Sequence, residues 1–407
     1  MIEQGRALAA DCRRELTEHI LPFWNQLSDP RGGFYGRMDA ALKLYPDAPK
    51  GVILHARILW AYSSAYLALQ DPALLEHAAH AYRFLRTCCY DKAYGGMFWS
   101  VTAQGEPCDT IKHTYNQAFC IYGLCAYYRA SGDVTALELA EKLFDTIEKK
   151  TPDAYGYGEA FTRDWQPADN EALSENGLSA VKTMNTVLHL VEAYTELYRV
   201  TRREQVAQRL RWLLDLTRNR IYDPERCALR VFFDGQWNEI GDVYSYGHDI
   251  EASWLLTRAC DVLEDETYTA AFAEIAVRIA GKIQSCALEQ GALNDEYAAG
   301  NINKKRVWWV EAEGVVGFLN AYQLSGDPAF FRTAQQLWRY IRTYQIDRRE
   351  GGEWHAEVAF DNVPMQVFDM AGPWKCPYHN SRMCLETMQR IRAMTQLMQR
   401  NRRERTA

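Results

Sequence analysis

Three histidines, His189, His248 and His379, are the side chains of this sequence best suited to proton transfer. A neutral imidazole, with an ordinary pKa near 6.5, can take up and return a proton at neutral pH without a metal. Three histidines and a carboxylate could also hold zinc or iron. Because HExxH and every other close ligand spacing are absent from the sequence, we expect acid–base chemistry rather than metal catalysis.

Other polar side chains stand at fixed distances before five turn residues. The turn residues are Asp71, Asp133, Arg203, Asp265 and Asp327. At 14 residues before them lie Arg57, Phe119, His189, Glu251 and Glu313. At 18 residues before them lie Ile53, Tyr115, Asn185, Gly247 and Trp309, with His248 one residue away from this set. Positions four residues apart share one face of a helix, so we predict that these side chains converge at one end of a ring.

A purely structural network is the alternative interpretation of this set, with Arg57 paired to Glu251 or Glu313. Buried ionisable groups are costly unless they are paired or used, and functional sites collect them. The convergence of so many ionisable groups therefore favours a functional site. Three tryptophans, Trp308, Trp309 and Trp374, are expected to border it as stacking surfaces for a pyranose ring, although at least one of the adjacent pair is expected in the core.

The turn residues mark an internal repeat of roughly 60 to 70 residues. After Asp133, apolar residues recur with helical spacing, and the same offsets after Asp71 are apolar as well. A single apolar stripe predicts an outer helix that faces water on its other side, with the aspartate as its N-cap. A second helix ends five residues before each turn residue and is apolar on most faces, most clearly over 178–200. Each repeat is thus predicted to be a buried inner helix followed by an outer helix.

Stretches rich in glycine and aromatic residues follow the outer helices and predict short hairpins. They lie at 32–35, 95–99, 155–158, 229–233, 291–293 and 351–354. With a first outer helix near 2–27 and a last inner helix near 378–398, the chain holds six helix pairs. An open solenoid could be built from the same units. The polar side chains gathered inside the ring favour an all-α, closed (α/α)6 barrel with short β-hairpins at one rim, as a single domain over 1–399 with a basic, disordered tail over 400–407.

Composition excludes several other classes of protein. Apolar residues make up 48% and charged residues 24% of the 407 residues, which is typical of a globular chain. The net charge of −7 and the lack of a basic stripe before the tail argue against a nucleic-acid partner. No apolar run approaches the roughly 18 residues of a membrane helix, and the N-terminus does not resemble a signal peptide, so we expect a cytoplasmic protein without a membrane partner. We expect a monomer, with a weak dimer as the alternative.

Motifs for cofactors and for other nucleophiles are absent from the sequence. It contains no GxGxxG, no GxxxxGK[ST] and no GxSxG, so we predict no nucleotide cofactor and no serine nucleophile of that type. The 11 cysteines include no CxxC pair, and several lie in apolar helical stretches, which indicates reduced thiols in the core. The remaining histidines, His19, His55, His77, His80, His113 and His355, are expected to be surface or core residues, with His55 and His113 beside the polar set.

At these residues the chain resembles the N-acylglucosamine 2-epimerase superfamily, and most closely its cellobiose 2-epimerases. The resemblance runs from about Leu16 to Arg392, and it rests on segments 51–57, 113–116, 173–177, 245–251, 306–313 and 372–380. It implies an (α/α)6 barrel that epimerises C2 of the reducing-end glucose in β-1,4-linked disaccharides, without a cofactor. Cellobiose would give glucosylmannose, and lactose would give epilactose.

The resemblance also implies a role for each candidate residue. His248 and His379 would be acid/base histidines on opposite faces of C2, with Glu251 orienting His248. The open-chain carbonyl and hydroxyls would be held by Arg57, Tyr115, Asn185 and His189. Trp308 and Trp374 would stack on the two sugar rings, and Trp309 and Glu313 would complete the substrate-binding set.

Two other activities remain open at this point. One is a monosaccharide enzyme, either an N-acylglucosamine 2-epimerase or an aldose–ketose isomerase, which would not need the second aromatic surface that Trp374 would provide. The other is an inverting glycoside hydrolase, which needs two carboxylates on either side of the bond. Its candidate carboxylates are Glu175, Asp249, Glu251 and Glu313. A noncatalytic carbohydrate-binding protein would have no need for three histidines beside an arginine.

Overall fold

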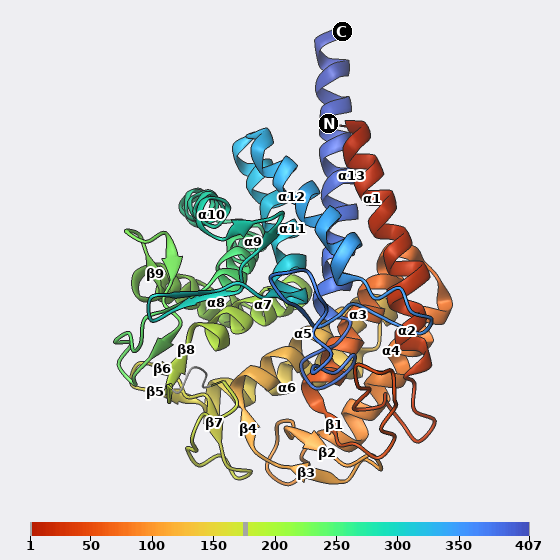
Figure 1. Ribbon diagram of the computed structural model, residues 1–407. Coiled ribbons are helices and arrows are strands. Elements are labelled where there is room, and N and C mark those ends of the chain that lie inside the picture. Colours follow the sequence, from red (N-terminus) through yellow and green to blue (C-terminus); the bar gives the residue numbers. More distant parts are fainter. Residues whose placement is uncertain (1, 174–177, 407) are drawn as a thin grey trace.

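Two concentric sets of helices form the structure (Figure 1). A computed structural model describes residues 2–173 and 178–406, apart from the side chains of residues 398 and 400–406. The inner helices are α3 (Val52–Leu69), α5 (Thr114–Ser131), α7 (Met184–Thr201), α9 (Tyr246–Leu263), α11 (Trp308–Ser325) and α13 (Tyr378–Thr406). The outer helices are α1 (Ile2–Glu15) with α2 (Leu21–Gln26), α4 (Pro72–Phe84), α6 (Val134–Lys150), α8 (Glu204–Leu216), α10 (Glu266–Cys286) and α12 (Pro328–Tyr340).

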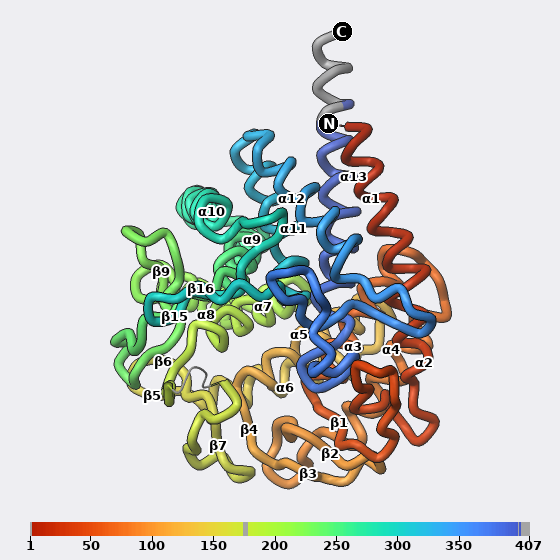
Figure 2. Tube along the Cα trace, in the orientation of Figure 1, coloured from red at the N-terminus to blue at the C-terminus, as the bar shows by residue number. Residues whose placement is uncertain are grey.

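The inner helices form a closed ring. Each packs against the next one along the chain, and α13 packs against α3. Helix α13 also lies beside α1, so the first and last helices of the chain are neighbours at one edge of the molecule (Figure 2). The predicted (α/α)6 barrel is therefore confirmed. Helix α7 begins at Met184, six residues after the predicted start of the segment 178–200, because Lys182–Thr183 forms a strand (β8) that leads into the helix.

The turn residues that revealed the repeat have the predicted capping role. Asp71, Asp133, Asp265 and Asp327 each accept a hydrogen bond from a backbone N–H of the outer helix that follows. Arg203 caps α8 without a side-chain bond. The outer helices α4, α6, α10 and α12 therefore start with the same cap, because an aspartate carboxylate satisfies amides that have no partner within the helix.

Short strands gather where the inner helices begin. The predicted hairpins occur as β5–β6 (Pro152–Asp153, Gly156–Tyr157), β9–β10 (Tyr222–Asp223, Ala228–Leu229), β13–β14 (Leu288–Glu289, Ala292–Leu293) and as bridges 28–34, 90–97 and 346–354. Further strands link neighbouring repeats as β1–β2 (Lys50–Gly51, Ser100–Val101), β4–β7 (Lys112–His113, Ala160–Phe161), β8–β11 (Phe232–Phe233), β12–β15 (Val243–Ser245, Glu296–Ala298) and β17–β18 (Arg306–Val307, Glu357–Val358). Strand β3 (Pro107–Asp109) pairs with β2, and β16 (Asn301–Asn303) pairs with β15.

In each linking pair, the strand before one inner helix pairs with a strand from the following loop. The Met38–Ala371 bridge makes the same connection between the last repeat and the first. A belt of backbone hydrogen bonds thus fixes the positions at which the inner helices begin.

A polar side chain on four inner helices also ties this belt to the barrel. His55, Gln117, Asp249 and Glu311 each accept a hydrogen bond from a backbone N–H of the preceding hairpin region, at distances of 2.7–2.9 Å. These four residues lie 16 positions before their turn residues, between the two sets that the sequence analysis singled out. Their burial therefore has a structural explanation, namely the satisfaction of buried backbone amides.

Two expectations need qualification. Among the described residues, Val52–Leu69 is long and apolar enough to cross a membrane, so the expectation that no segment reaches this length was wrong. This segment is the inner helix α3, and 72% of it is buried in the barrel, which accounts for its apolar character.

Helix α13 extends to Thr406, but the side chains of 400–407 lie outside the described residues, and the disordered tail stays a prediction. The 11 cysteines are all free, as predicted.

Candidate active site

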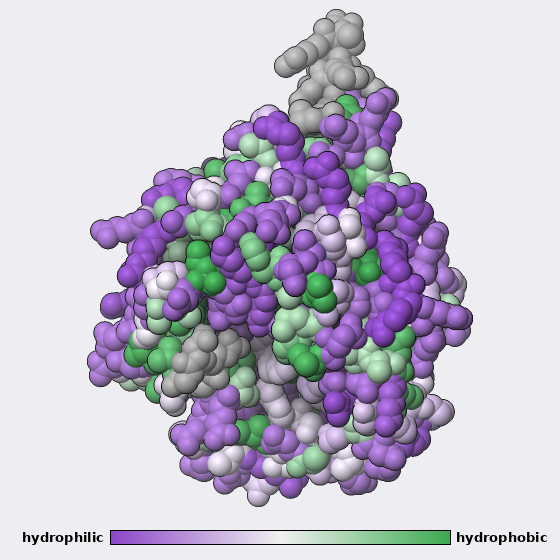
Figure 3. All heavy atoms as spheres, in the orientation of Figure 1, coloured by the Kyte–Doolittle hydropathy of each residue, from purple (hydrophilic) through white to green (hydrophobic). Residues whose placement is uncertain are grey.

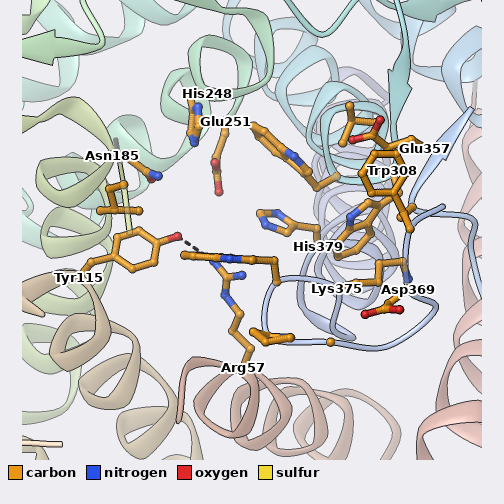
Figure 4. A pocket seen from close by; sticks show the side chains of 18 of the residues that line it. Arg57, Tyr115, Asn185, His248, Glu251, Trp308, Glu357, Asp369, Lys375 and His379 are labelled. Carbon is orange, nitrogen blue, oxygen red and sulfur yellow. Dashed lines mark hydrogen bonds between the residues drawn. The ribbon is translucent and has the colours of Figure 1, made fainter. Parts of the chain in front are cut away.

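A cavity of about 400 Å³ opens at the end of the ring where the inner helices begin. Figure 3 shows a hollow near the middle of this face. Ten predicted site residues line the cavity: Arg57, Tyr115, Asn185, His189, His248, Glu251, Trp308, Trp309, Trp374 and His379. All of them lie in, or just before, the first two turns of an inner helix. Figure 4 labels all of them except His189, Trp309 and Trp374. The predicted convergence is therefore confirmed.

His379 is held by a carboxylate from the neighbouring helix α11. Its Nδ1 lies 2.7 Å from Oε1 of Glu313. Burial raises the pKa of Glu313, and the charge and hydrogen bond of Arg382 oppose this shift. While the carboxylate is ionised it can only accept, so that Nδ1 carries the proton and Nε2 is left to accept one. Burial lowers the pKa of His379 well below its ordinary value, and the nearby charges of Arg382 and Arg57 lower it further. His379 is therefore a neutral base at neutral pH.

His248 has a different partner from the one predicted. Its Nδ1 lies 2.7 Å from the hydroxyl of Ser245, which also caps α9 by accepting from the backbone N–H of His248. Glu251 was expected to orient His248, and this was wrong, because Glu251 instead accepts a hydrogen bond from Arg382. Burial lowers the pKa of His248 to about 3, and His189 and Arg57 contribute to this shift. His248 is thus also neutral, with a hydroxyl partner that can donate or accept.

The indole of Trp309 lies between these two histidines. Its ring centre is 4.7 Å from that of His248 and 5.5 Å from that of His379. The two imidazoles therefore come from different helices, α9 and α13, and border the same cavity.

Hydrogen-bond donors occupy another part of the wall. Arg57 donates to the hydroxyl oxygen of Tyr115 at 2.9 Å (Figure 4). Burial raises the pKa of Tyr115 to about 12, against the effect of Arg57, so the phenol keeps its proton. His189 donates from Nδ1 to Glu192 at 2.9 Å and meets the Tyr115 ring edge-on. Arg57 does not form the ion pair with Glu251 or Glu313 that the structural alternative required.

Three buried polar atoms of residues that line the cavity lack a protein partner. Within the described part of the chain, no hydrogen bond is formed by Nε of Arg57, Oδ1 of Asn185 or Oε2 of Glu357. Buried polar atoms are normally satisfied, and an exception at a cavity wall is typical of a group that binds a ligand. One donor and two acceptors are therefore available to a polar ligand.

Glu251 and Glu313 differ in their access to the cavity. Glu251 lines it, and burial raises the pKa of Glu251 to about 7 although Arg382 opposes this shift. Glu313 does not line it, so its predicted direct role in substrate binding was wrong. It accepts instead from His379, from Arg382 at 2.6 Å and from the indole of Trp254 at 2.9 Å. Glu313 thus holds the cavity residue His379 without lining the cavity itself.

The sequence analysis missed the side chains of this supporting layer. Glu192 and Trp254 stand 11 residues before their turn residues, one helical turn deeper than the predicted set. A search three positions further along the same helix face would have found both. Arg382 and Ser245 carried no comparable signal, because α13 has no turn residue after it and Ser245 precedes its helix. Among the other residues that line the cavity, Glu357, Phe368, Asp369 and Lys375 were missed as well.

Trp308 is buried, as expected for one of the adjacent tryptophans, whereas Trp374 is exposed. Trp308 is 4% exposed and Trp374 is 45% exposed, although both line the cavity. The ammonium group of Lys375 lies 4.4 Å from the centre of the Trp308 ring, which is a cation–π contact. Trp374 is therefore the indole that a ligand could cover at the mouth.

The described residues do not form a metal site with three histidine ligands. The one group with suitable geometry among them is Glu251, Glu313 and His379, whose ligand atoms lie within 4.8 Å of one another. The guanidinium of Arg382 already donates to both carboxylates. The positive charge of Arg382 therefore compensates the negative charges of Glu251 and Glu313.

Of the carboxylates considered for a hydrolase, Glu251 lines the cavity. Asp249 accepts from the backbone N–H of Leu229 and lines a second cavity, of about 370 Å³, between α9 and α10. Glu175 lies outside the described residues. Among the remaining histidines, His55 and His113 are buried, with partners in the backbone of Phe34 and in the side chain of Asn170, and neither lines the active-site cavity.

Comparisons with known proteins agree with this geometry. Residues 33–381 match the family described as N-acylglucosamine 2-epimerase (GlcNAc 2-epimerase). A cellobiose 2-epimerase from Ruminococcus albus is 56% identical over 384 residues, which cover 94% of this chain and 99% of the relative. A crystal structure of a sugar epimerase from a ruminal bacterium is 56% identical and superposes with a TM-score of 0.93, covering 94% of this chain and 98% of the other.

A second solved structure extends the similarity to a more distant relative. The cellobiose 2-epimerase from Bacillus thermoamylovorans is 44% identical, with a TM-score of 0.91, over 95% of this chain and all of the other. The family match and these relatives cover nearly the whole barrel and all ten residues that line the cavity as predicted. The chain therefore belongs to the N-acylglucosamine 2-epimerase family and is a carbohydrate epimerase.

Proposed function

We propose that this enzyme epimerises C2 of the reducing-end glucose of β-1,4-linked disaccharides, converting cellobiose to glucosylmannose and lactose to epilactose. The observation that carries the proposal is the pair of neutral imidazoles, His248 and His379, which reach one cavity from different helices. Cellobiose 2-epimerases at 56% and 44% identity support the choice of a disaccharide.

Epimerisation needs two groups because a base that returned the proton to the same face would change nothing. In the open-chain sugar, one imidazole removes the C2 proton as the C1 carbonyl becomes the oxygen of a cis-enediolate. The other imidazole, which is neutral in the free enzyme, first takes up a proton from water and then delivers it, as an imidazolium, to the opposite face of C2. The C1 carbonyl re-forms, and the first histidine returns to water the proton that it removed. Atoms and charge balance with water as the proton source and sink.

The donors of the cavity suit the negative charge that develops in this step. The enediolate oxygens need preorganised donors in a site withdrawn from water. Arg57 and Tyr115 provide them, and Asn185 and Nε2 of His189 offer acceptors for sugar hydroxyls. A catalytic metal is not required by this scheme.

The exposed Trp374 supports a disaccharide over a monosaccharide. An indole can stack on the apolar face of a pyranose, and Trp374 at the mouth lies apart from the histidines deeper in the cavity. We assign it to the non-reducing sugar. Trp308, which is nearly buried beside His379 at 5.4 Å between ring centres, borders the reducing-end sugar.

The test is proton NMR of chelator-treated enzyme with cellobiose in deuterated water. We expect a mannose-ended disaccharide that carries deuterium at C2. His248→Ala and His379→Ala should each lower kcat by about 100-fold or more, since a positioned acid or base contributes that much. Free glucose as the product would establish a hydrolase instead, and turnover of N-acylglucosamine or mannose with no reaction of cellobiose would establish a monosaccharide enzyme.

A further inference from the structure

Arg382 lies at the centre of the buried polar side chains below the cavity. It is fully buried in α13, and its guanidinium donates to carboxylates from three other inner helices. The nitrogen–oxygen distances are 2.6 Å to Glu192 of α7 and 2.6 Å to Glu313 of α11, and a third contact reaches Glu251 of α9. One cation thus joins four helices of the ring.

Two of these carboxylates also hold a histidine of the cavity. Glu192 accepts from Nδ1 of His189 at 2.9 Å, and Glu313 accepts from Nδ1 of His379 at 2.7 Å. Arg382 therefore reaches each of the two imidazoles through a carboxylate, and its Nη2 also lies 3.3 Å from Nδ1 of His379.

This arrangement works only while the carboxylates are ionised. An ionised carboxylate accepts the Nδ1 proton and leaves Nε2 as the acceptor, whereas a protonated one can donate to Nδ1 and move the imidazole proton to Nε2. Three carboxylates close together in a dry site disfavour one another's ionisation. A planar guanidinium offers five donors in a rigid fork, so it can contact all three, whereas an ammonium group is a point charge with three donors.

We propose that Arg382 is a positioning residue that sets the orientation and the Nδ1–H tautomer of both His189 and His379, through Glu192 and Glu313. The inference rests on the proposed function, in which the unprotonated Nε2 atoms act as acceptors in the cavity. It assigns to one residue, remote from the substrate, the preparation of two histidines on different helices.

Arg382 also acts on His379 through its charge. Burial is the largest cause that lowers the pKa of His379, and Arg382 is the next, followed by Arg57 of α3 and the neighbouring imidazoles. Other ionisable groups that interact with Arg382 or its carboxylates are Tyr115, Tyr122, Tyr378 and Glu386. Removal of Arg382 takes away a positive charge and leaves the carboxylates in place, so the pKa of His379 should rise.

The variant Arg382→Met tests the proposal, because methionine fills space without charge or donors. We expect kcat to fall about 100-fold with KM changed less than about threefold, since the residue does not touch substrate. We also expect the acid limb of kcat/KM against pH to move to higher pH, because a more basic His379 is protonated over a wider range. Nitrogen-15 NMR of the histidine rings should show that His189 and His379 lose the Nδ1–H tautomer.

Arg258→Met is the matched control. Arg258 of α9 pairs with Glu386 in the same barrel, and no hydrogen bond connects that pair to a cavity histidine within the described residues. We expect Arg258→Met to leave the acid limb and both tautomers unchanged. If Arg382→Met is folded and loses activity equally at every pH, with both tautomers retained, Arg382 is merely structural and the proposal is wrong.

Arg382→Lys keeps the proposal testable if the methionine variant does not fold. A lysine keeps the charge but cannot contact three carboxylates, so we expect a lower kcat with an acid limb near that of the wild type. Wild-type kcat in Arg382→Lys would overturn the proposal. The tautomer measurement does not need turnover. An inactive wild-type enzyme that shows both Nδ1–H tautomers would therefore refute the proposed function alone, and loss of neither tautomer in the variants would refute the role of Arg382 alone.

Discussion

Substitution of Ser245 by alanine should separate the orientation of His248 from its chemistry. The Ser245 hydroxyl is 2.7 Å from Nδ1 of His248 and caps α9 through a longer contact of 3.4 Å. Ser245→Ala removes both contacts and leaves the imidazole in the cavity. The spacing of His248 and Glu251 suggested instead that Glu251 has this role, so the variant tests the structural assignment directly.

The size of the effect follows from the two lost hydrogen bonds. A neutral hydrogen bond is worth about 0.5–1.5 kcal/mol, which corresponds to a decrease in kcat of about threefold to tenfold if the bond holds the reactive orientation. Deletion of the imidazole itself should cost about 100-fold or more. Loss of the cap should lower the free energy of unfolding by about 1 kcal/mol. The kcat of Ser245→Ala should therefore lie between that of the wild type and that of His248→Ala.

The assay is initial-rate epimerisation of cellobiose, with thermal unfolding measured in parallel. Ser245→Thr is the control that keeps the hydroxyl, and it should retain most of the activity. Asp133→Ala is the control for loss of an N-cap, because Asp133 caps the outer helix α6 without contacting the cavity, and it should lose stability but not kcat. Wild-type kcat in Ser245→Ala would refute the assignment, and so would an equal loss in Asp133→Ala.

Two further predictions concern the mouth of the cavity and a buried carboxyl group. Trp374→Ala should raise KM for cellobiose about threefold to tenfold with little change in kcat, since one stacking contact is worth about 0.5–1.5 kcal/mol; an unchanged KM would place the outer sugar elsewhere. Burial raises the pKa of Asp249 to about 8, so its neutral form is favoured in the folded state and its contribution to stability is lost as pH rises from about 4 through 8. Asp249→Asn keeps an acceptor for Leu229 without titrating. Its melting temperature relative to the wild type should increase between pH 5 and pH 8, and a constant difference would contradict this.

The fold was predictable because each repeat carries its own local signals. The aspartate caps and the apolar stripes are properties of single helices, and their recurrence with a period of 60 to 70 residues specified the pairing of inner and outer helices. The residues on the cavity wall followed from the same register. Once the inner helices were aligned on their turn residues, Arg57, His189 and Glu251 had to lie at equal depth in the ring.

The partners of these residues were less predictable because they depend on packing between helices. A spacing of three residues allows His248 and Glu251 to share a helix side, but it does not say which neighbouring group either one contacts. Arg382 reaches Glu251 from α13, 131 residues later in the chain. The serine that holds His248 precedes α9 and belongs to strand β12. Neither contact leaves a periodic signal in the sequence.

Closure of the barrel is a condition for the chemistry of the site as well as for the fold. His248 and His379 can be neutral bases because they are withdrawn from water, which lowers the pKa of both. The same withdrawal would leave the carboxylates below them uncompensated, so the ring needs a buried cation, which Arg382 provides. Helix α13 contributes both His379 and Arg382, and it closes the ring by packing against α3 and α11. An open arrangement of the same helices would admit water to this interior, and water would compete for the hydrogen bonds by which the carboxylates hold His189 and His379.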